Sequence, residues 1–405
     1  MNSPVINHKA IKNYNRRKII NLLSVRRELT RQAISLKTGI SIPTVASNIQ
    51  ELIDEGLVEE AGTAESTGGR KAVIVRYLPD ARVSFGVEIT RTKVRILLSN
   101  LDLEIRFESE LVMEPFGRID EVMNRTSEEI ERILLSLGIP AEKVLGVGFS
   151  LPGTVNQKKM TLELAPNMGM KDILFKPFEE AFHYPIYIEN EANSGALAEL
   201  KLGKAAKSGE LVYVSVGGGI GTGLIINGKL YKGKNQRAGE FGHMTVVPGG
   251  KLCNCGRRGC WETFASCQAA LRYFKELQPQ SKATSFQELL VLAEEGDQQA
   301  AQALAKQALY IGRGLRLIIA GLSPSLILIA GDITSAWHRF GPAIEKEAVE
   351  LTLGGAVPRI LPTHEGEIAR LRGAAALVFQ RRSGREHLQE REQRSLLTEK
   401  RREPR

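Results

Sequence analysis

The sequence lacks any long apolar run, and this absence limits what kind of protein it encodes. No run approaches the roughly 20 apolar residues that a membrane-spanning helix needs, and residues 1–18 contain no apolar signal segment. We therefore expect a cytoplasmic protein with no membrane partner. Its 42% hydrophobic and 25% charged residues are ordinary for a globular protein, and 405 residues predict two or three domains.

Acidic residues are nearly absent from the N-terminal end. Residues 1–48 carry nine Lys and Arg but one acidic residue, Glu28. The last 25 residues carry nine Lys and Arg against five Glu, in a net charge of +9 for the chain. Such an excess of cations favours a polyanionic partner, although a solvated charged face is the alternative reading of charge alone.

The first 78 residues predict a winged helix-turn-helix. Thr30 is a suitable N-cap for a helix RQAISLKT that ends at Gly39. Ser41 then caps IPTVASNIQELIDE, which stops at Gly56. Two short helices joined by a tight turn form a helix-turn-helix, and the segments LVEE, AGTAESTGGRK and AVIVRYL predict a strand, a loop and a strand that together make a wing.

The second helix of this pair has an apolar and a polar side. Ile42, Val45, Ile49 and Leu52 share the apolar side. Small polar residues near the start of such a helix reach base edges in the major groove. The candidate DNA-contacting residues are Arg31, Pro43, Thr44, Ser47, Asn48, Gln50, Arg70 and Lys71. The alternative is a three-helix packing module that binds no nucleic acid.

Beyond Pro79-Asp80, predicted strands and helices alternate. Strands are expected over 82–90, 93–101, 104–112, 143–153, 184–192, 210–219 and 325–333, with helices over 119–137 and 301–322. This order predicts an α/β architecture with mixed sheets. Functional residues in such folds gather at the carboxyl ends of strands.

Several segments together resemble the ROK family of repressors, open reading frames and kinases, and specifically its repressor branch. VSVGGGIGTGLIINGKLYKG resembles the Gly-rich signature, GEFGH the E-x-G-H motif, and CNCGRRGCWE the C-x-C-G-x-x-G-C-x-E motif. FSLPGTV, APNMGMKD and IENEAN match three further segments. Among the repressors, IENEANSGA and SGELVYVSVGGGIGTG are nearest in wording to the xylose repressors.

The resemblance implies two ribonuclease-H-like lobes that close over a sugar, as in actin and hexokinase. We expect a winged helix-turn-helix over 1–78, a two-lobed sugar-binding domain over 79–380, and a charged disordered tail over 381–405. The family core ends near residue 380, so the resemblance assigns no role to the tail.

A metal site is predicted by three thiols and an imidazole. Cys253, Cys255, Cys260 and His243 offer four ligands that suit tetrahedral Zn²⁺ with no open position, so this zinc would be structural. The spacing C-x-C-x4-C, the upstream histidine and the family motif support this reading over ordinary core cysteines. Cys267 has no family counterpart and is expected to be a small buried residue.

The sugar pocket is assigned by motif match. Carboxylates and amides supply the directional hydrogen bonds that sugar hydroxyls need. The residues implied by the resemblance are Asn190, Glu191, Glu240, His243 and Glu262, bordered by Pro152, Gly153 and Asn167. For each of these residues taken singly, the alternative is an exposed polar residue that binds no ligand.

The sequence departs from the family's kinases at the phosphate loop. The kinase D-x-G-G-T-K turn corresponds to residues 88–93, Glu-Ile-Thr-Arg-Thr-Lys, where both glycines are missing. Backbone amides cannot approach phosphate closely past Cβ atoms and an arginine side chain. Glu191 stands at the position of the general base in the family's kinases. Ala330 and Asp332 stand where those kinases usually have glycines in the segment that binds adenosine. The intact Gly217–Gly223 stretch is read as a tight strand turn.

These observations favour a sugar-responsive repressor of carbohydrate utilisation genes, with xylose as the favoured effector and no catalytic residue. Its partners would be double-stranded operator DNA, a monosaccharide and a second copy of the chain, as a homodimer or higher homo-oligomer. An active sugar kinase that uses ATP is the alternative, and a partner-controlled interaction protein is a third reading.

Overall fold

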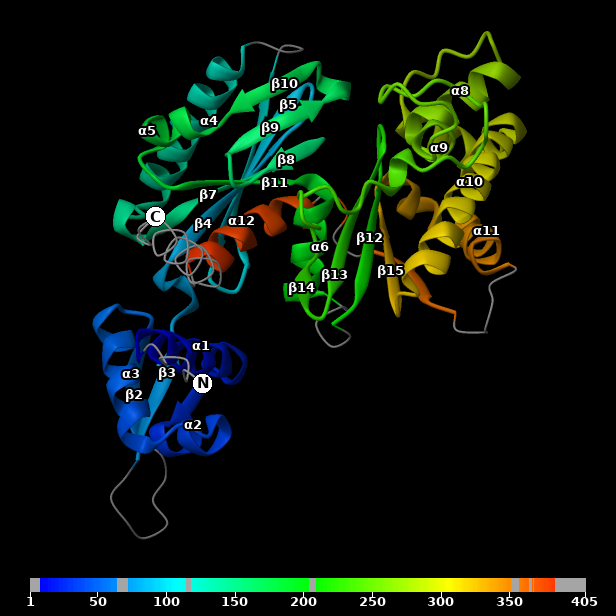
Figure 1. Cartoon of the computed structure of the whole chain (residues 1–405). Helices are drawn as coiled ribbons and strands as arrows, with labels where there is room; N and C mark the ends of the chain where they lie inside the picture. The colour runs from blue at the N-terminus through cyan, green and yellow to red at the C-terminus, as the bar shows by residue number, and fades with distance from the viewer. Residues whose placement is uncertain are drawn as a thin grey trace, which may run out of the picture.

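The computed structural model describes residues 8–63, 72–113, 118–203, 209–350, 357–363, 366 and 368–382. Figure 1 shows a small N-terminal head below a larger body of two lobes. The described strands form four sheets, in the orders β1-β3-β2, β10-β9-β8, β11-β7-β4-β5-β6 and β14-β13-β12-β15-β16. Among the helices of these described ranges, none has both the length and the apolar character needed to cross a membrane.

The head contains the predicted helix-turn-helix and the two strands of a wing. Its elements are α1 (His8–Arg26), β1 (Glu28–Thr30), α2 (Arg31–Thr38), α3 (Ile42–Asp54), β2 (Val58–Thr63) and β3 (Val73–Tyr77). Thr30 caps α2, because its hydroxyl accepts a hydrogen bond from the Ala33 amide. Gly39 ends α2 with φ 70°, a left-handed conformation that glycine adopts without a Cβ clash.

The beginning of α3 differs from the prediction. Ser41 stands at the cap position, but its hydroxyl pairs with the Thr44 hydroxyl at 2.8 Å instead of with a backbone amide. Ile42 is 53% exposed. It occupies the first helical position, before the buried stripe that includes Val45 and Ile49 begins.

The first lobe is built on a five-stranded sheet. Its strands are β4 (Val83–Ile89), β5 (Lys93–Asn100), β6 (Ile105–Val112), β7 (Val144–Leu151) and β11 (Ile186–Asn190). β4, β5 and β6 are antiparallel neighbours, while β7 runs parallel to both β4 and β11. α4 (Ile119–Leu137) packs its apolar side into the core of this lobe. The remaining elements are α5 (Glu179–Phe182) and the small sheet of β8 (Thr154–Asn156), β9 (Thr161–Ala165) and β10 (Met170–Leu174).

The second lobe has its own sheet and a helical layer. The strands are β12 (Leu211–Val216), β13 (Ile220–Ile226), β14 (Lys229–Leu230), β15 (Leu326–Ala330) and β16 (Arg359–Pro362). The helices are α7 (Glu262–Ala265), α8 (Cys267–Leu277), α9 (Phe286–Glu294), α10 (Gln298–Leu322) and α11 (Trp337–Val349). Because side chains alternate along a strand, Val212 and Val214 join the core with α8, α10 and α11, while Leu211 and Tyr213 face the opposite layer.

Two helices, α6 (Glu191–Leu202) and α12 (Ile368–Arg382), lie between the two sheets (Figure 1). They cross so closely that a Cβ on Gly373 would lie 1.7 Å from the Ser194 carbonyl oxygen. α12 lies on the first sheet, where a Cβ on Gly148 would meet the Ala374 carbonyl oxygen at 1.9 Å. α6 lies on the second, where a Cβ on Gly223 would lie 2.4 Å from the Ala192 carbonyl oxygen. The two lobes are therefore joined through a pair of closely packed helices.

The head contacts the first lobe near the linker turn Pro79–Ala81. Leu101, in the turn between β5 and β6, packs against the apolar core of the head. Next to it, Asp102 forms an ion pair with Arg27. Arg82 donates to the backbone carbonyl of Glu55 at 2.6 Å. The expected tail over 381–405 lies outside the described residues from 383 onward.

Candidate functional site

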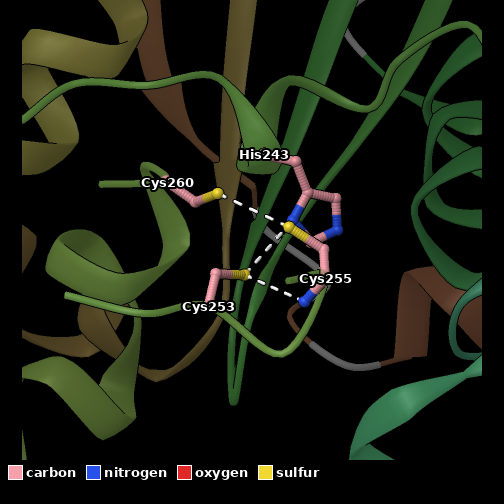
Figure 2. Close-up of side chains that lie close together, drawn as sticks. All are labelled: His243, Cys253, Cys255 and Cys260. Carbon is pink, nitrogen blue, oxygen red and sulfur yellow. Dashed lines mark hydrogen bonds between the residues drawn. The ribbon is translucent and has the colours of Figure 1, made fainter. Parts of the chain in front are cut away.

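The predicted metal ligands converge on one point in the second lobe. One ligand atom from each of His243, Cys253, Cys255 and Cys260 lies within 4.8 Å of all the others, and Figure 2 shows the four side chains turned toward one another. Cys253 Sγ is 3.6 Å from His243 Nδ1, and Cys255 Sγ is 3.6 Å from Cys260 Sγ. This set of donors can hold a metal ion.

Backbone geometry brings these ligands together across a loop with little regular structure. His243 ends the short 3-10 turn Phe241–His243, and isolated bridges join Thr245 to Cys260 and Leu252 to Arg258. Gly259 is required by this packing. Its φ is +82°, and a Cβ there would lie 1.8 Å from the Val247 carbonyl oxygen. The second glycine of the CNCGRRGC motif is therefore fixed by close backbone approach.

The loop is also anchored to α10 by Trp261, which is buried and donates from Nε1 to the Tyr310 carbonyl at 2.7 Å. Cys253 and Cys260 are buried as well. Burial raises the pKa of both thiols. A bound cation would favour their thiolate forms, since a metal ligand must be deprotonated.

Two of the predicted sugar-binding carboxylates lie against this cluster. Glu262 Oε1 is 2.8 Å from Cys253 Sγ and 3.5 Å from His243 Nδ1. On the other side of the ring, His243 Nε2 is 3.9 Å from Glu240 Oε2. Desolvation raises the pKa of Glu240, although half of its side chain is accessible. The imidazole therefore connects the candidate metal site with both acids.

Asn190 and Gly153 form a second group, in the first lobe. Asn190 caps α6, because its Oδ1 accepts hydrogen bonds from the amides of Ala192 at 2.9 Å and Asn193 at 3.2 Å. Its Nδ2 donates to the Gly153 carbonyl at 2.9 Å. Within these contacts the side chain keeps one N–H donor for a ligand. Glu191, the next residue, is the first of α6.

The start of β13 lies between the two groups. The Cβ position of Gly221 is 3.9 Å from Glu191 Oε1, and that of Gly242 is 2.2 Å from the Ile220 carbonyl oxygen. Adjacent residues of one strand therefore contact both the Glu191 side and the segment that carries Glu240 and His243. Asn167 belongs to the 3-10 turn Pro166–Met168, but its side chain lies outside the part of the structure that is described.

The strand that leads into the turn between β4 and β5 carries a buried acid. Glu88, at the end of β4, is 2% exposed. Its carboxylate is 2.5 Å from Arg370 Nε of α12 and 3.6 Å from Arg95 Nη1 of β5. This acid is therefore held by two guanidinium groups of the chain itself. Of the Gly217–Gly223 stretch, which was read as a tight turn, only Gly217–Gly219 form the turn between β12 and β13, whereas Gly221 and Gly223 lie within β13.

Most of the candidate DNA-contacting residues lie on α3. Pro43, Ser47 and Gln50 are exposed on α3 and Thr44 is half-buried. Asn48 corrects the prediction: it is 3% exposed, and its Nδ2 donates to the Thr44 carbonyl at 2.7 Å. It faces the head's core, because a position three residues after Val45 lies on the same side of the helix.

The other candidate DNA contacts lie toward the wing. Arg31, at the start of α2, is paired with Glu60 of β2 at 2.6 Å. Arg70 and Lys71 lie outside the described residues. Sequence reasoning assigned no role to Glu189 and Lys232, which meet beside Asn190. The only signal for Glu189 was its place within the IENEAN segment.

Comparisons with known proteins agree with both parts of the architecture. The ROK family profile matches residues 84–381, and the winged helix-turn-helix DNA-binding profile matches residues 12–59. The xylose repressor of Bacillus spizizenii is 30% identical over 379 residues, which cover 91% of this chain and 96% of that protein.

Solved structures share the fold. A ROK family transcriptional regulator, a homolog of the Escherichia coli MLC protein, superposes with a TM-score of 0.79 at 24% identity, covering 91% of this chain and 96% of that one. A ROK family glucokinase from Streptomyces griseus, in complex with glucose and AMPPNP, has a TM-score of 0.65 at 26% identity and covers 74% of this chain and 99% of its own. The predicted fold class is confirmed, and the chain belongs to the ROK family, with a winged helix-turn-helix at its N-terminal end.

Proposed function

We propose that this protein is a DNA-binding transcriptional repressor that responds to a sugar and controls genes of carbohydrate utilisation. The observation that carries the proposal is the direct attachment of a winged helix-turn-helix head to a two-lobed ROK body. The name of the Bacillus relative, which matches across both parts, makes xylose the first effector to test.

The four-residue cluster fits a structural zinc ion. With zinc–sulfur bonds of about 2.3 Å and zinc–nitrogen bonds of about 2.0 Å, tetrahedral geometry separates two sulfurs by about 3.8 Å and sulfur from nitrogen by about 3.5 Å. The separations of 3.6 Å for Cys255–Cys260 and for Cys253–His243 are close to these values. Zinc would fix a loop that has little secondary structure of its own, and through His243 it would hold Glu240 and Glu262 in place.

Sugar binding is assigned to the space bordered by the two side-chain groups. Glu240, His243 and Glu262 come from the second lobe, while Asn190, Glu191 and Gly153 come from the first or from the helix α6 that follows it. Acceptors and donors on two lobes suit a ligand that carries hydroxyl groups on several sides. A sugar between the lobes binds the closed arrangement better than the open one, which is the differential affinity that a switch requires.

A regulatory role is favoured over phosphoryl transfer. Glu88 stands where the kinases of the family have aspartate, and it is buried between Arg370 and Arg95. A carboxylate whose charge is balanced by two arginine side chains is poorly placed to bind the metal ion of a metal–nucleotide complex. The residues after it, Ile89 to Lys93, carry side chains where a phosphate loop needs glycine.

On DNA, we infer a homodimer that presents two heads to a two-fold operator. Each recognition helix α3 would contact one half-site in the major groove, with half-sites about one DNA turn apart. Pro43, Thr44, Ser47 and Gln50 would be the residues near the bases, while Arg31, Arg70 and Lys71 would contact the backbone or the minor groove.

The test begins with in vitro selection of binding sites from a random duplex library, because the operator is not known in advance. Fluorescence anisotropy then measures the affinity of the selected duplex while D-xylose or D-glucose is titrated. A change in DNA affinity of at least about fivefold at saturating sugar is expected for an allosteric coupling. A duplex affinity that no monosaccharide changes would refute the sugar response, and failure to select any sequence would refute the DNA-binding role.

The kinase alternative is tested on the same preparation. The structural likeness to the Streptomyces griseus glucokinase motivates it. ADP release is measured with ATP, Mg²⁺ and each sugar, with Glu191→Ala as the matched variant. Turnover in the wild type that disappears in this variant would establish an enzyme.

A further inference from the structure

A segment of the second lobe crosses to the first lobe directly before the candidate sugar residues. We call residues 231–237 the crossing segment. It follows β14 of the second sheet and ends shortly before Glu240. Its side chains contact the first lobe at three points, all on β11 or on the hairpin of β8 and β9. The segment is thus a physical link between the lobes at the edge of the site.

The strongest of these contacts is a buried ion pair. Lys232 Nζ is 2.6 Å from Glu189 Oε2, with the lysine side chain 19% exposed and the glutamate 2% exposed. Gln157 joins the pair, because its Nε2 donates to Glu189 Oε2 at 2.7 Å and its Oε1 accepts from Lys232. Desolvation lowers the pKa of Lys232, and the Glu189 carboxylate opposes this effect.

Glu189 is also fixed to the candidate sugar residues of the first lobe. Its Oε1 accepts from the backbone amide of Asn190 at 2.9 Å and from Asn193 Nδ2 at 3.0 Å. One carboxylate therefore holds the first turn of α6 with one oxygen and the second lobe with the other. A shift of the lysine would act on the residue that caps α6.

The crossing segment is attached to the second lobe at its start, because the Tyr231 amide donates to the Leu224 carbonyl at 2.7 Å. The Ala238 amide closes it with a hydrogen bond to the Lys232 carbonyl at 3.0 Å. The next residue, Gly239, lies so close to β13 that a Cβ there would be 2.7 Å from the Thr222 carbonyl oxygen. Lys232 and Glu240 are therefore tied to the same strand, and opening of the lobes has to separate Lys232 from Glu189.

The contacts of Gln236 and Arg237 with the first lobe are weaker than the buried Lys232–Glu189 ion pair. Gln236 has a left-handed backbone, with φ 58°, and its Oε1 accepts from the Gln157 amide at 3.1 Å. A non-glycine residue is held in this conformation only where its surroundings determine it. Arg237 pairs with Glu163 at 3.1 Å, but the arginine is 66% exposed, so this pair is screened by solvent.

We propose that Lys232 and Glu189 form an interlobe latch that positions Glu240 and His243 against Asn190 and Glu191. This inference rests on the proposed sugar-binding function and names positioning residues for it. Separating the pair leaves a carboxylate buried without its cation, which is strongly unfavourable. The latch thereby sets the lobe arrangement in which both groups of sugar residues face one ligand.

The test compares Lys232→Met, Glu189→Gln, the double variant K232M/E189Q, and Glu163→Gln as the matched control for an exposed pair on the same segment. D-xylose and D-glucose affinities are measured by calorimetry, and stability by urea denaturation. The double variant carries no unpaired buried charge, so its stability is expected to recover from that of Lys232→Met, while its sugar affinity stays about tenfold weaker than wild type. Glu163→Gln is expected to remain within about twofold.

The two readouts separate positioning from simple charge neutralisation. A double variant that binds sugar like wild type would overturn the latch, and so would an unchanged affinity in Lys232→Met. X-ray scattering without sugar gives an independent measure, with a larger radius of gyration expected for K232M/E189Q and an unchanged one for Glu163→Gln. If the wild type binds neither sugar, the sugar assignment fails, and scattering alone decides the latch: an unchanged radius in the double variant overturns it.

Discussion

Asn190 makes two separable contributions, and three substitutions at this position distinguish them. Its Oδ1 caps α6 through two backbone amides, and its Nδ2 ties the helix to the Gly153 carbonyl. Replacing an N-cap asparagine by alanine costs about 1 kcal/mol. Leaving the part-buried Gly153 carbonyl without its donor costs about 1 kcal/mol more. We therefore expect Asn190→Ala to lower the free energy of unfolding by about 2 kcal/mol.

The other two substitutions separate the contribution of the cap from that of the hydrogen bond to Gly153. Asn190→Ser keeps a capping oxygen and loses only the tie to Gly153, so it is expected to cost about 1 kcal/mol. Asn190→Asp keeps the cap as well, but it places a carboxylate oxygen against the Gly153 carbonyl. It is therefore expected to be less stable than Asn190→Ser, despite the favourable charge at a helix N-terminus.

Urea denaturation followed by tryptophan fluorescence is a suitable assay for this series. The chain has two tryptophans, Trp261 and Trp337, and both lie in the second lobe, against which α6 packs. Equal losses for Asn190→Ser and Asn190→Ala would show that the cap contributes nothing. An unchanged transition midpoint in Asn190→Ala would refute the whole account of this residue.

Three further outcomes are expected. Cys255→Ser should reduce bound zinc from one ion per chain toward zero, measured by mass spectrometry of the purified protein, because a three-ligand site binds the metal more weakly; full zinc content would refute the ligand set. Gln50→Ala should lower the affinity for the selected operator and leave the melting temperature of the protein unchanged. Asn48→Ala should lower that melting temperature, because Asn48 is buried and Gln50 is exposed. The reverse pattern would contradict the orientation of α3. Glu129 accepts a hydrogen bond from Arg132, whose guanidinium lowers the pKa of the Glu129 carboxyl. The stabilisation from this pair is present above the unfolded pKa of about 4.3 and is lost as pH falls through the lower folded pKa. Glu129→Gln should therefore flatten the acid side of the plot of unfolding free energy against pH, and identical plots for the two proteins would exclude this role.

Local signals in the sequence predicted α2 and α3 of the head, all five strands of the first large sheet, and α4 and α10, but not α6, α12 or the small sheet of β8, β9 and β10. The helix predicted over 119–137 has those bounds in the structure, because a continuous amphipathic stripe ends at Gly138 in the left-handed conformation. The strand expected over 184–192 is shorter, since Asn190 caps a helix that begins at Glu191. Ile11 of α1 is 43% exposed although it is apolar, because apolar spacing does not show where tertiary contacts begin.

The metal ligands could be predicted because they lie close together in the sequence, whereas the latch could not. His243 and the three cysteines fall within 18 residues, with a spacing that suits one ion. Lys232 and Glu189 are 43 residues apart, with Glu189 on β11 of the first sheet and Lys232 in the segment that follows β14 of the second. No local pattern pairs them, because their contact depends on how the lobes pack. Asn48 was misassigned for a related reason: its polarity suggested an exposed position, but it lies on the buried side of the helix and donates from Nδ2 to the carbonyl of the preceding turn.

The way the head is attached constrains how a sugar can change DNA binding. The contacts of the head described above, through Leu101, Asp102 and Arg82, are with the first lobe and the linker. If the second lobe closes over a sugar, these contacts keep the head and the first lobe together as one unit within a subunit. A change in the spacing of two recognition helices then requires that the second copy be held through the lobe that moves. The sugar response of such a protein would accordingly depend on its dimer contacts as much as on its pocket, and a monomeric variant would bind sugar without transmitting the signal to DNA.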